Sequence, residues 1–266
     1  MSGRAGGLVL VDKPVGPSSF AVVRVQRRRY GLKAGHAGTL DPAASGLLLV
    51  LLGPCTRLAR YLVGLDKRYV TRIRLGVRTA TGDAEGEPVE ETEVPDDLEG
   101  ALERLRGTVE LRVPAASAVK IAGERAYRLH RRGVEVEMPA RTSVVHGLRV
   151  AKLEFPEVEL ELHVSSGTYV RAIADALGGH CRTLRRVAVG PFHVEDANED
   201  AVLEPRAALP HLPELELDES GVARVRSGRP VEAAGEGRAR LVHAGRLVAV
   251  GLVGGGVAHP ETVLPS

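Results

Sequence analysis

Aromatic residues and cysteines are scarce in this sequence. None of its 266 residues is tryptophan and only 3% are aromatic, so each tyrosine and phenylalanine is worth locating individually. The two cysteines, Cys55 and Cys181, are far apart and have no metal-like spacing. A zinc site needs about four clustered ligands, and the sequence offers no such cluster. Two isolated thiols are typical of a reducing cytosol, so we expect a cytoplasmic protein without a metal.

Long hydrophobic runs are also missing. The longest, from Gly46 to Gly53, is far shorter than the roughly 20 apolar residues of a membrane helix. The apolar run near the N-terminus is too short for a secretory signal peptide, because charge returns at Asp12. We therefore expect no membrane partner. The apolar share of 44% is nevertheless sufficient for a folded core.

Basic residues are absent from one segment. From Asp83 to Glu103 there are ten acidic residues and no lysine or arginine, which leaves 36 basic against 24 acidic residues elsewhere. A basic surface favours polyanions such as RNA, and the candidate segments for phosphate contacts are 24–33, 120–132 and 182–186. Ordinary solvated arginines without a specific function would give the same pattern, so charge alone leaves both interpretations open.

Hydrophobic periodicity and turn residues divide the chain into two parts. In the first part, the expected strands are 7–11, 47–52, 67–75, 109–113, 144–155, 158–165 and 182–189. The expected helices are 18–30, 96–106 and 168–177, with Ser18 or Ser19 capping the first and Thr168 the last. Pro210 and Pro213 then bracket a linker, and short apolar runs follow at 222–225, 239–242 and 247–253. These features predict a mixed α/β catalytic domain followed by a small all-β module.

The segment from Gly35 to Leu47, GHAGTLDPAASGL, is the most informative part of the chain. Its glycines permit backbone conformations that side chains forbid, and Pro42 holds Asp41 toward an extended conformation. A carboxylate on such a loop, beside a hydrophobic strand, can act as a nucleophile or a general base. As an isolated pattern, an Asp-Pro turn that merely starts a strand is the preferred interpretation, because such turns are common.

The full string resembles the catalytic loop of the TruB-type tRNA pseudouridine-55 synthases. That loop reads G-H-x-G-T-L-D-P-x-A-x-G-L-L, and every fixed position is met between Gly35 and Leu48. The similarity covers about residues 7–192, and the motifs occur in the family's order. The further motifs are Asp12-Lys13-Pro14, Lys67-Arg68-Tyr69 with Thr79, Thr81 and Asp83, Ser117-Ala118-Val119-Lys120, Ser166-Gly167-Thr168-Tyr169-Val170-Arg171 and Leu184-Arg185-Arg186.

The resemblance implies an α+β fold with two domains. The catalytic domain, residues 1–208, would have a central mixed, mainly antiparallel sheet flanked by helices and an RNA-binding insertion at about residues 115–146. A small all-β PUA-like C-terminal domain would follow at residues 213–266. The C-terminal match is weaker, and a plain stabilising β appendage is the alternative, because fold alone does not fix function.

The resemblance also assigns roles to individual residues. Asp41 corresponds to the essential catalytic aspartate, Tyr69 to the tyrosine that stacks on the target base, and Arg171 to the arginine that pairs with the aspartate. His36 corresponds to the histidine that helps to hold the flipped-out RNA. We also expect Lys13 and Tyr169 to bind RNA near the pocket, because they occupy matching motif positions.

Each role has a structural alternative. Arg171 can pair with Asp175, four residues further along its helix. Tyr69 can be an ordinary strand aromatic, and His36 can be a hydrogen-bonding loop residue. One position departs from the family: Ser166 stands where many members have lysine, which removes one expected phosphate contact.

The implied reaction is the isomerisation of a uridine in the T-loop of tRNA to pseudouridine. The bond from ribose to N1 of uracil breaks and a bond to C5 forms, without gain or loss of electrons or atoms, so we expect no cofactor. The uridine must be flipped out at a cost of a few kcal/mol, and stacking on Tyr69 offsets on the order of 1–3 kcal/mol. We expect tRNA as the partner, no obligate protein partner, and a monomer.

Three other functions fit parts of the pattern. A non-catalytic RNA-binding or RNA-folding protein would need the basic patches but not Asp41. A glycoside hydrolase would need two carboxylates at a fixed separation, of which the motifs supply one. A relative that relies on a guide RNA would share the chemistry, but a compact chain with a small tail favours a stand-alone tRNA enzyme.

Overall fold

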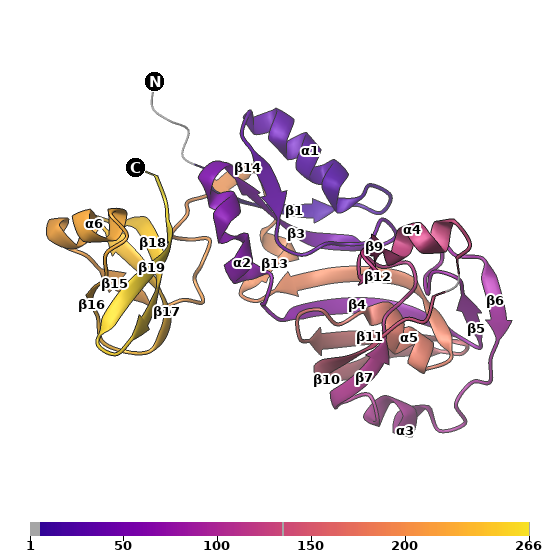
Figure 1. Ribbon diagram of the computed structural model, residues 1–266. Helices are drawn as coiled ribbons and strands as arrows, with labels where there is room; N and C mark the ends of the chain where they lie inside the picture. Colours follow the sequence, from indigo (N-terminus) through magenta and orange to yellow (C-terminus); the bar gives the residue numbers. More distant parts are fainter. Residues whose placement is uncertain (1–5, 135, 266) are drawn as a thin grey trace.

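The computed structural model describes residues 6–134 and 136–265, which form a large and a small lobe, each built on its own β-sheet (Figure 1). Eight strands of the large sheet follow the order β14-β1-β3-β12-β4-β11-β10-β7. Their bounds are β1 (Leu8–Lys13), β3 (Ser45–Leu52), β4 (Lys67–Leu75), β7 (Gly107–Arg112), β10 (Ala140–Glu154), β11 (Glu157–Val164), β12 (Gly179–Val189) and β14 (Asn198–Leu203). Among the described strands of this sheet only β3 and β12 pair in parallel, so it is mixed and mainly antiparallel, as expected.

Short elements complete the large lobe. β2 (Ala34–His36) pairs with β3, and β13 (Phe192–His193) pairs with β12. The helical elements are α1 (Ser19–Tyr30), the 3-10 turn η1 (Gly53–Leu58), α2 (Ala59–Leu62), α3 (Leu98–Glu103), α4 (Ala126–Arg131), α5 (Val170–Ala176) and the 3-10 turn η2 (Val194–Asp196). Two hairpins lie outside the sheet: β5 (Val77–Thr79) with β6 (Pro88–Glu91), and β8 (Lys120–Ile121) with β9 (Glu124–Arg125).

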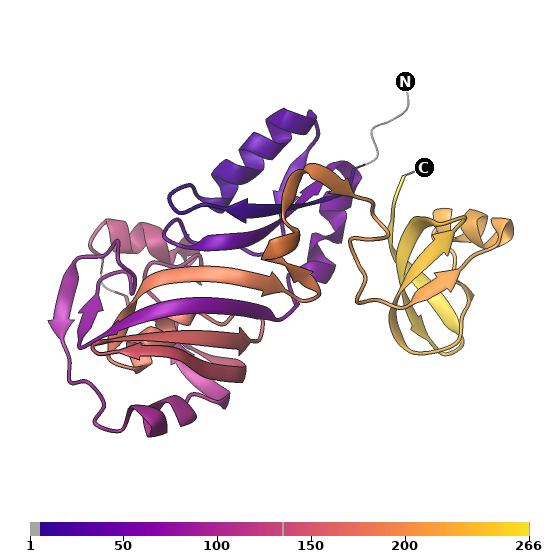
Figure 2. The same ribbon diagram turned by 180° about the vertical axis from the view of Figure 1, so that it is seen from behind.

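The large sheet has a covered and an open face. Seen from behind, β12, β4, β11 and β10 have no helix across them (Figure 2). Burial along β4 and β11 alternates as this arrangement requires, since every second residue of a strand points to the same face. The bounds of β4 agree with the predicted strand 67–75, and its buried residues include Tyr69, Thr71, Ile73 and Leu75.

Strand β3 lies between two hydrophobic clusters, which explains why it is almost entirely apolar. Leu48, Val50 and Leu52 belong to one cluster. The alternate residues of the strand, Leu47, Leu49 and Leu51, belong to a second cluster on the other side. A strand with both faces buried reads as a continuous hydrophobic run, and it gives the loop that precedes it a rigid base.

Two predicted details of the helices are wrong. Helix α1 is capped by Ser18 and ended by Gly31 as predicted, but Thr168 does not cap α5. That helix starts at Val170, and the Thr168 hydroxyl instead lies 3.2 Å from the Ser165 hydroxyl. The apolar run 222–225, expected in an all-β module, lies within the helix α6 (Glu219–Arg226), which Asp218 caps.

The small lobe is a five-stranded sheet packed with α6. Its order is β15-β17-β18-β19-β16, with bounds β15 (Glu214–Glu216), β16 (Val231–Glu232), β17 (Gly237–His243), β18 (Arg246–Gly254) and β19 (Val257–Val263). This arrangement agrees with the expected PUA-like fold. The domain boundaries proposed from sequence, 1–208 and 213–266, stay a prediction. Among the described helices, none has the length and apolar character needed to cross a membrane.

Candidate active site

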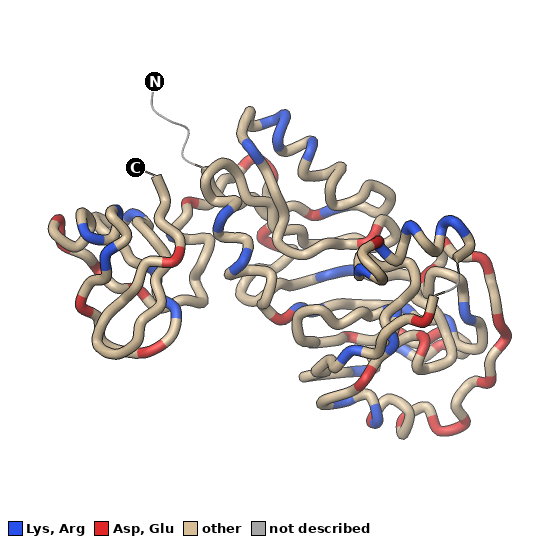
Figure 3. The backbone as a smooth tube through the Cα atoms, in the orientation of Figure 1, with Lys and Arg blue, Asp and Glu red and all other residues tan. Residues whose placement is uncertain are grey.

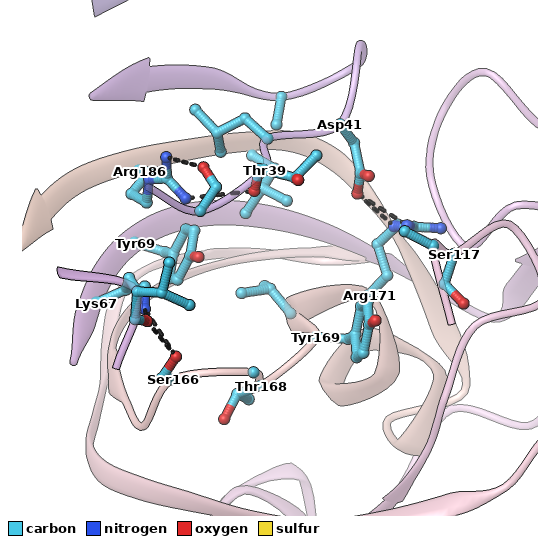
Figure 4. Close-up of a pocket in the computed structure, with 18 residues that line it drawn as sticks. Thr39, Asp41, Lys67, Tyr69, Ser117, Ser166, Thr168, Tyr169, Arg171 and Arg186 are labelled. Atoms are coloured by element: carbon cyan, nitrogen blue, oxygen red, sulfur yellow. Dashed lines mark hydrogen bonds and ion pairs between the residues drawn. The ribbon is translucent and has the colours of Figure 1, made fainter. Parts of the chain in front are cut away.

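A cavity of about 250 Å³ opens beside the Gly35–Leu47 loop, between the start of β4, the start of α5 and the segment after β7 (Figure 4). Its size is sufficient for a pyrimidine ring. The lining is part polar and part apolar, which suits a base that is both stacked and hydrogen-bonded. The residues around it include Thr39, Leu40, Asp41, Lys67, Tyr69, Ser117, Ser166, Thr168, Tyr169, Arg171, Leu184 and Arg186.

Asp41 and Arg171 meet at one side of this cavity, although 130 residues separate them in sequence. The Nη2 atom of Arg171 lies 2.8 Å from Oδ2 of Asp41, and Nε donates to the same oxygen at 3.0 Å. The arginine side chain is 3% exposed, whereas the aspartate is 37% exposed. The carboxylate therefore faces the cavity while its cation lies behind it.

Arg171 is held by four groups at once. Besides Asp41, it donates to the backbone carbonyls of Thr81 and Ala116, and its Nε lies 3.8 Å from Oδ2 of Asp83. A buried guanidinium needs such a complete set of acceptors, because an unpaired buried charge is costly. The alternative pairing with Asp175 is wrong, since that carboxylate lies 2.9 Å from Nε of Arg78.

The loop that carries Asp41 is fixed by hydrogen bonds to its backbone. The Ser19 hydroxyl, in the first turn of α1, accepts from Leu40 N and donates to Leu40 O, both at 2.8 Å. The backbone N of Gly16 donates to Pro42 O at 2.9 Å. Both residues that flank Asp41 are therefore anchored, and the carboxylate has little freedom to move with the backbone.

Arg186 supports the same loop from below. Its side chain is 1% exposed, and it donates to Leu47 O at 2.8 Å, Gly38 O at 3.1 Å and Thr39 O at 3.4 Å. The prediction that the segment 182–186 contacts RNA does not hold for Arg186, because its guanidinium is buried, and Arg185 is paired with Asp12 at 2.8 Å. Arg186 thus holds the loop that carries Asp41 in place.

Lys13 was predicted as an RNA-binding residue, but the structure places it behind the loop. Its side chain is fully buried, and Nζ donates to Pro14 O, Pro17 O and Pro42 O at 2.8, 2.9 and 3.4 Å. Burial lowers the pKa of Lys13, and the nearby Asp41 partly opposes this shift. A lysine without access to the cavity supports the loop instead of contacting the substrate.

His36 lies at the end of β2, paired with Val50 and one step before the loop turns, but it does not line the cavity. Its Nδ1 is buried, and within the described chain no group bonds to it. Burial and the neighbouring Arg186 lower the pKa of His36 below its ordinary value of 6.5. The ring is therefore neutral at neutral pH.

The two predicted tyrosines both line the cavity. Tyr69 is 9% exposed on β4, and Tyr169 precedes α5 (Figure 4). Tyr69 comes from the central sheet, so its ring is held by a rigid element. The sequence prediction that these residues share one pocket with Asp41 and Arg171 agrees with this geometry.

Lys67 and Ser166 form a second polar contact that sequence reasoning did not single out. Lys67 Nζ donates to the Ser166 hydroxyl at 2.9 Å and to Val63 O and Leu65 O at 2.6 Å each. Burial, with help from Arg186, lowers the pKa of Lys67 to about 8. Ser166, at the position where the family resemblance leads us to expect lysine, accepts a hydrogen bond from Lys67 of β4.

Comparisons with known proteins identify the family. The profile for the TruB family pseudouridylate synthase, N-terminal domain, matches residues 24–170. The tRNA pseudouridine synthase B of Ruegeria pomeroyi is 40% identical over 97% of this chain and 95% of its own length. That of Leifsonia xyli subsp. xyli is 44% identical over 83% of this chain and 78% of its own.

Solved structures show the same relationship. A chain in an H/ACA RNP bound to a substrate RNA containing 2′-deoxyuridine superposes with a TM-score of 0.73 and 25% identity, over 98% of this chain and 85% of that chain. A Cbf5-Nop10-Gar1 complex gives 0.72 and 26%, over 97% and 84%. The chain therefore belongs to the TruB family of pseudouridylate synthases and is an isomerase of that class.

Proposed function

We propose that this protein converts uridine-55 in the T-loop of tRNA to pseudouridine, with Asp41 as its catalytic carboxylate. The observation that carries the proposal is the half-exposed Asp41 carboxylate, paired at 2.8 Å with a buried arginine at the edge of a cavity of pyrimidine size. Relatives that share most of the chain are named tRNA pseudouridine synthase B, which supports tRNA as the substrate.

The reaction balances within the nucleotide. The bond from C1′ to N1 breaks, the uracil turns, and a bond from C1′ to C5 forms while the proton on C5 is lost and N1 gains one. Both contacts of Arg171 with Asp41 use Oδ2, so Oδ1 is left for the substrate. That oxygen can add to the nucleotide as a nucleophile or take a proton from the ribose, and either route needs the ionised carboxylate.

The remaining predicted residues hold the flipped nucleotide. Tyr69 lies within the cavity as a stacking surface, which offsets part of the cost of flipping, and Tyr169 closes the side next to Arg171. His36 is neutral and lies outside the cavity, so it contributes to holding the flipped-out RNA loop by its shape and supplies no charge. Lys13 contributes indirectly, by holding Pro42 next to the catalytic aspartate.

We also propose that the protein acts in the cytoplasm as a monomer, without a guide RNA or protein partner. The chain covers 95% of the length of the Ruegeria pomeroyi tRNA pseudouridine synthase B, so the comparison concerns nearly the whole of that enzyme. A purified chain mixed with an unmodified tRNA transcript tests this proposal directly. Modification that requires an added RNA or protein would contradict it.

The experiment for the chemistry measures tritium release from tRNA that carries 5-tritiated uridine. Asp41→Asn keeps the size of the side chain but removes its negative charge, so release should fall by at least about a thousandfold, in the range that loss of a catalytic group produces. RNA binding by this variant should persist. Sequencing of the product should place the pseudouridine at position 55, and an active Asn variant or another position would refute the assignment.

A further inference from the structure

Helix α1 carries basic residues that the chemistry above does not use. Arg24, Arg27 and Arg28 lie on the helix and Lys33 follows it. Within residues 6–134 and 136–265, none of these four side chains forms a hydrogen bond, an ion pair or a ring contact. Arg29, in the same turn, is by contrast paired with Asp200. Within the described residues, these four cations therefore have no partner, whereas the charge of the adjacent Arg29 is neutralised by Asp200.

The helix dipole explains only part of this pattern. Basic residues in the last turn of a helix are stabilised by its partial negative charge, which applies to Arg27 and Arg28. Arg24 lies before the last turn and Lys33 after the helix, so neither gains much from this effect. Side by side, like charges repel one another, and a polyanion that neutralises them removes the repulsion.

These cations gather on the outer side of the helix. The buried residues of α1 are Ser19, Val22, Val23 and Gln26. At 100° per residue, Phe20, Arg24 and Arg28 fall on the opposite side. Arg24, Arg27, Arg28 and Lys33 also surround a surface hollow together with Gly31 and Leu32. Figure 3 shows these basic positions along the upper edge of the large lobe, away from the acidic residues at its lower right edge.

Phe20 begins this row and lies next to the catalytic loop. It is 71% exposed, one of only three phenylalanines in the chain. Its neighbour Ser19 is bonded to both the N and O atoms of Leu40, which lines the cavity. An exposed aromatic ring followed by arginines is the combination with which proteins bind single-stranded nucleic acid, since a base stacks on the ring and cations track the phosphates.

We propose that Phe20, Arg24, Arg27, Arg28 and Lys33, here called the α1 strip, bind the substrate RNA outside the cavity. Phe20 stacks on an unpaired base next to the cavity, and the basic residues contact the phosphates of the strand that leads away from it. From Phe20 to Arg28 the helix rises about 12 Å, a length that spans about three to four phosphates. The inference rests on the proposed function, because the occupant is the same RNA.

The first test removes the charges. The variant Arg24→Gln/Arg27→Gln/Arg28→Gln should bind an unmodified tRNA transcript at least about tenfold more weakly at roughly 0.1 M salt. The slope of log Kd against log salt should fall by about two, since each single-strand phosphate contact contributes about 0.7. The single-turnover rate at saturating RNA should stay within about twofold of the wild type, because the strip does not line the cavity.

A matched control removes equal charge elsewhere. Arg104, Arg149 and Lys152 are exposed near the opposite edge of the sheet, and the last two are already paired with Glu161 and Glu154. Their triple Gln variant should bind RNA within about twofold of the wild type, with an unchanged salt slope. If both triple variants weaken binding equally, net charge is responsible and the α1 strip is not an RNA site.

The second test concerns the ring. Phe20→Ala should weaken RNA binding by about tenfold, Phe20→Trp should retain it, and Phe20→Leu should not, since only an aromatic face stacks on a base. Phe155 is 73% exposed at the β10–β11 turn, so Phe155→Ala is a control of equal exposure and should leave binding unchanged. Unchanged thermal unfolding of each variant excludes a folding defect.

The results separate this inference from the proposed function. Strip-dependent RNA affinity in a protein that modifies no uridine would support the α1 strip and refute the catalytic proposal. Full modification of tRNA, with affinity and salt slope independent of the strip, would support the catalytic proposal and refute the α1 strip.

Discussion

At the scale of single residues, the candidate active site is surrounded by four buried cations: Lys13, Lys67, Arg171 and Arg186, each at most 6% exposed. Arg171 makes ion pairs with Asp41 and Asp83, whereas the other three donate mainly to backbone carbonyls. Carbonyl groups satisfy the hydrogen bonds but leave the positive charge in place. The hydrogen bonds from Lys13 and Arg186 hold the loop that carries Asp41 in one shape, and the net positive charge around the cavity favours an anionic ligand.

Lys67 gives this arrangement a pH dependence that can be measured. Burial lowers its pKa to about 8 from the ordinary value of 10.5. Below pH 8 the folded and unfolded chains both hold the proton, and the folded chain carries the cost of burying the charge. Between about pH 8 and 10.5 only the unfolded chain holds it, so this residue makes the free energy of unfolding rise with pH, by about 1.4 kcal/mol per unit.

Replacement by an uncharged side chain should remove that slope. The free energy of unfolding of Lys67→Met minus that of the wild type should therefore decrease as the pH rises from about 8 to 10.5, when measured by chemical denaturation. Lys120→Met, at an exposed lysine, is the control and should give a constant difference. A constant difference for Lys67→Met as well would show that the folded chain does not disfavour the charged lysine.

At the scale of elements, the loop that carries Asp41 ends at Gly46, where β3 pairs with its two neighbours. Gly46 is paired with Lys13 of β1 on one side and Arg186 of β12 on the other. Its φ is +104°, and a Cβ would lie 2.2 Å from the backbone O of Arg186. Gly46→Ala should therefore lower the free energy of unfolding by about 2–4 kcal/mol and reduce the rate of modification as the loop shifts.

Gly35, at the other end of the same loop, is the matched control. A Cβ there would meet nothing closer than Thr56 Cγ2 at 3.8 Å, and its φ lies outside the positive region. Gly35→Ala should retain the stability and activity of the wild type. Equal effects of the two alanines, measured by thermal unfolding and single-turnover rates, would mean that Gly46 is no special anchor for the loop.

The local sequence pattern predicted the helices and strands better than it predicted which distant residues contact one another. The alternation of β4 and the caps of α1 are set by neighbouring residues, so the sequence contained them. The pairing of Asp41 with Arg171 was predicted only through the family resemblance, because no local pattern links residues that far apart. The prediction for Arg186 was wrong because an arginine next to other arginines in the sequence suggests an exposed position. Its burial follows from the pairing of β12 with β3, which places Arg186 opposite Gly46, and the sequence does not indicate this pairing.

At the scale of the whole molecule, the two lobes share one hydrophobic cluster. Leu58, Tyr61 and Leu62 from the large lobe belong to the same cluster as Val250 and Leu264 from the small lobe. The Tyr61 hydroxyl lies 2.7 Å from the Thr262 hydroxyl, and Arg57 Nη1 donates to Val263 O at 2.6 Å. This interface is apolar and its polar groups are hydrogen-bonded, as in the core of a single domain. We therefore expect the two lobes to unfold together.

Tyr61 is the residue whose loss should separate them. It is 8% exposed, and besides Thr262 it contacts Glu261 and the guanidinium of Arg238. Tyr61→Ala should cost about 3–5 kcal/mol, as truncation of a buried aromatic side chain does, and should split the single calorimetric transition into two. The large lobe would retain its sheet, because the cluster around β3 that faces α1 does not include this tyrosine.

Tyr61→Phe distinguishes packing from hydrogen bonding in that contact. It keeps the ring within the cluster and removes only the bonds to Thr262 and Glu261, so the cost should be about 1 kcal/mol, with one transition preserved. Two transitions in this variant would mean that the polar contacts couple the lobes. If Tyr61→Ala unfolds in a single transition at the same temperature as the wild type, the shared cluster does not couple the lobes.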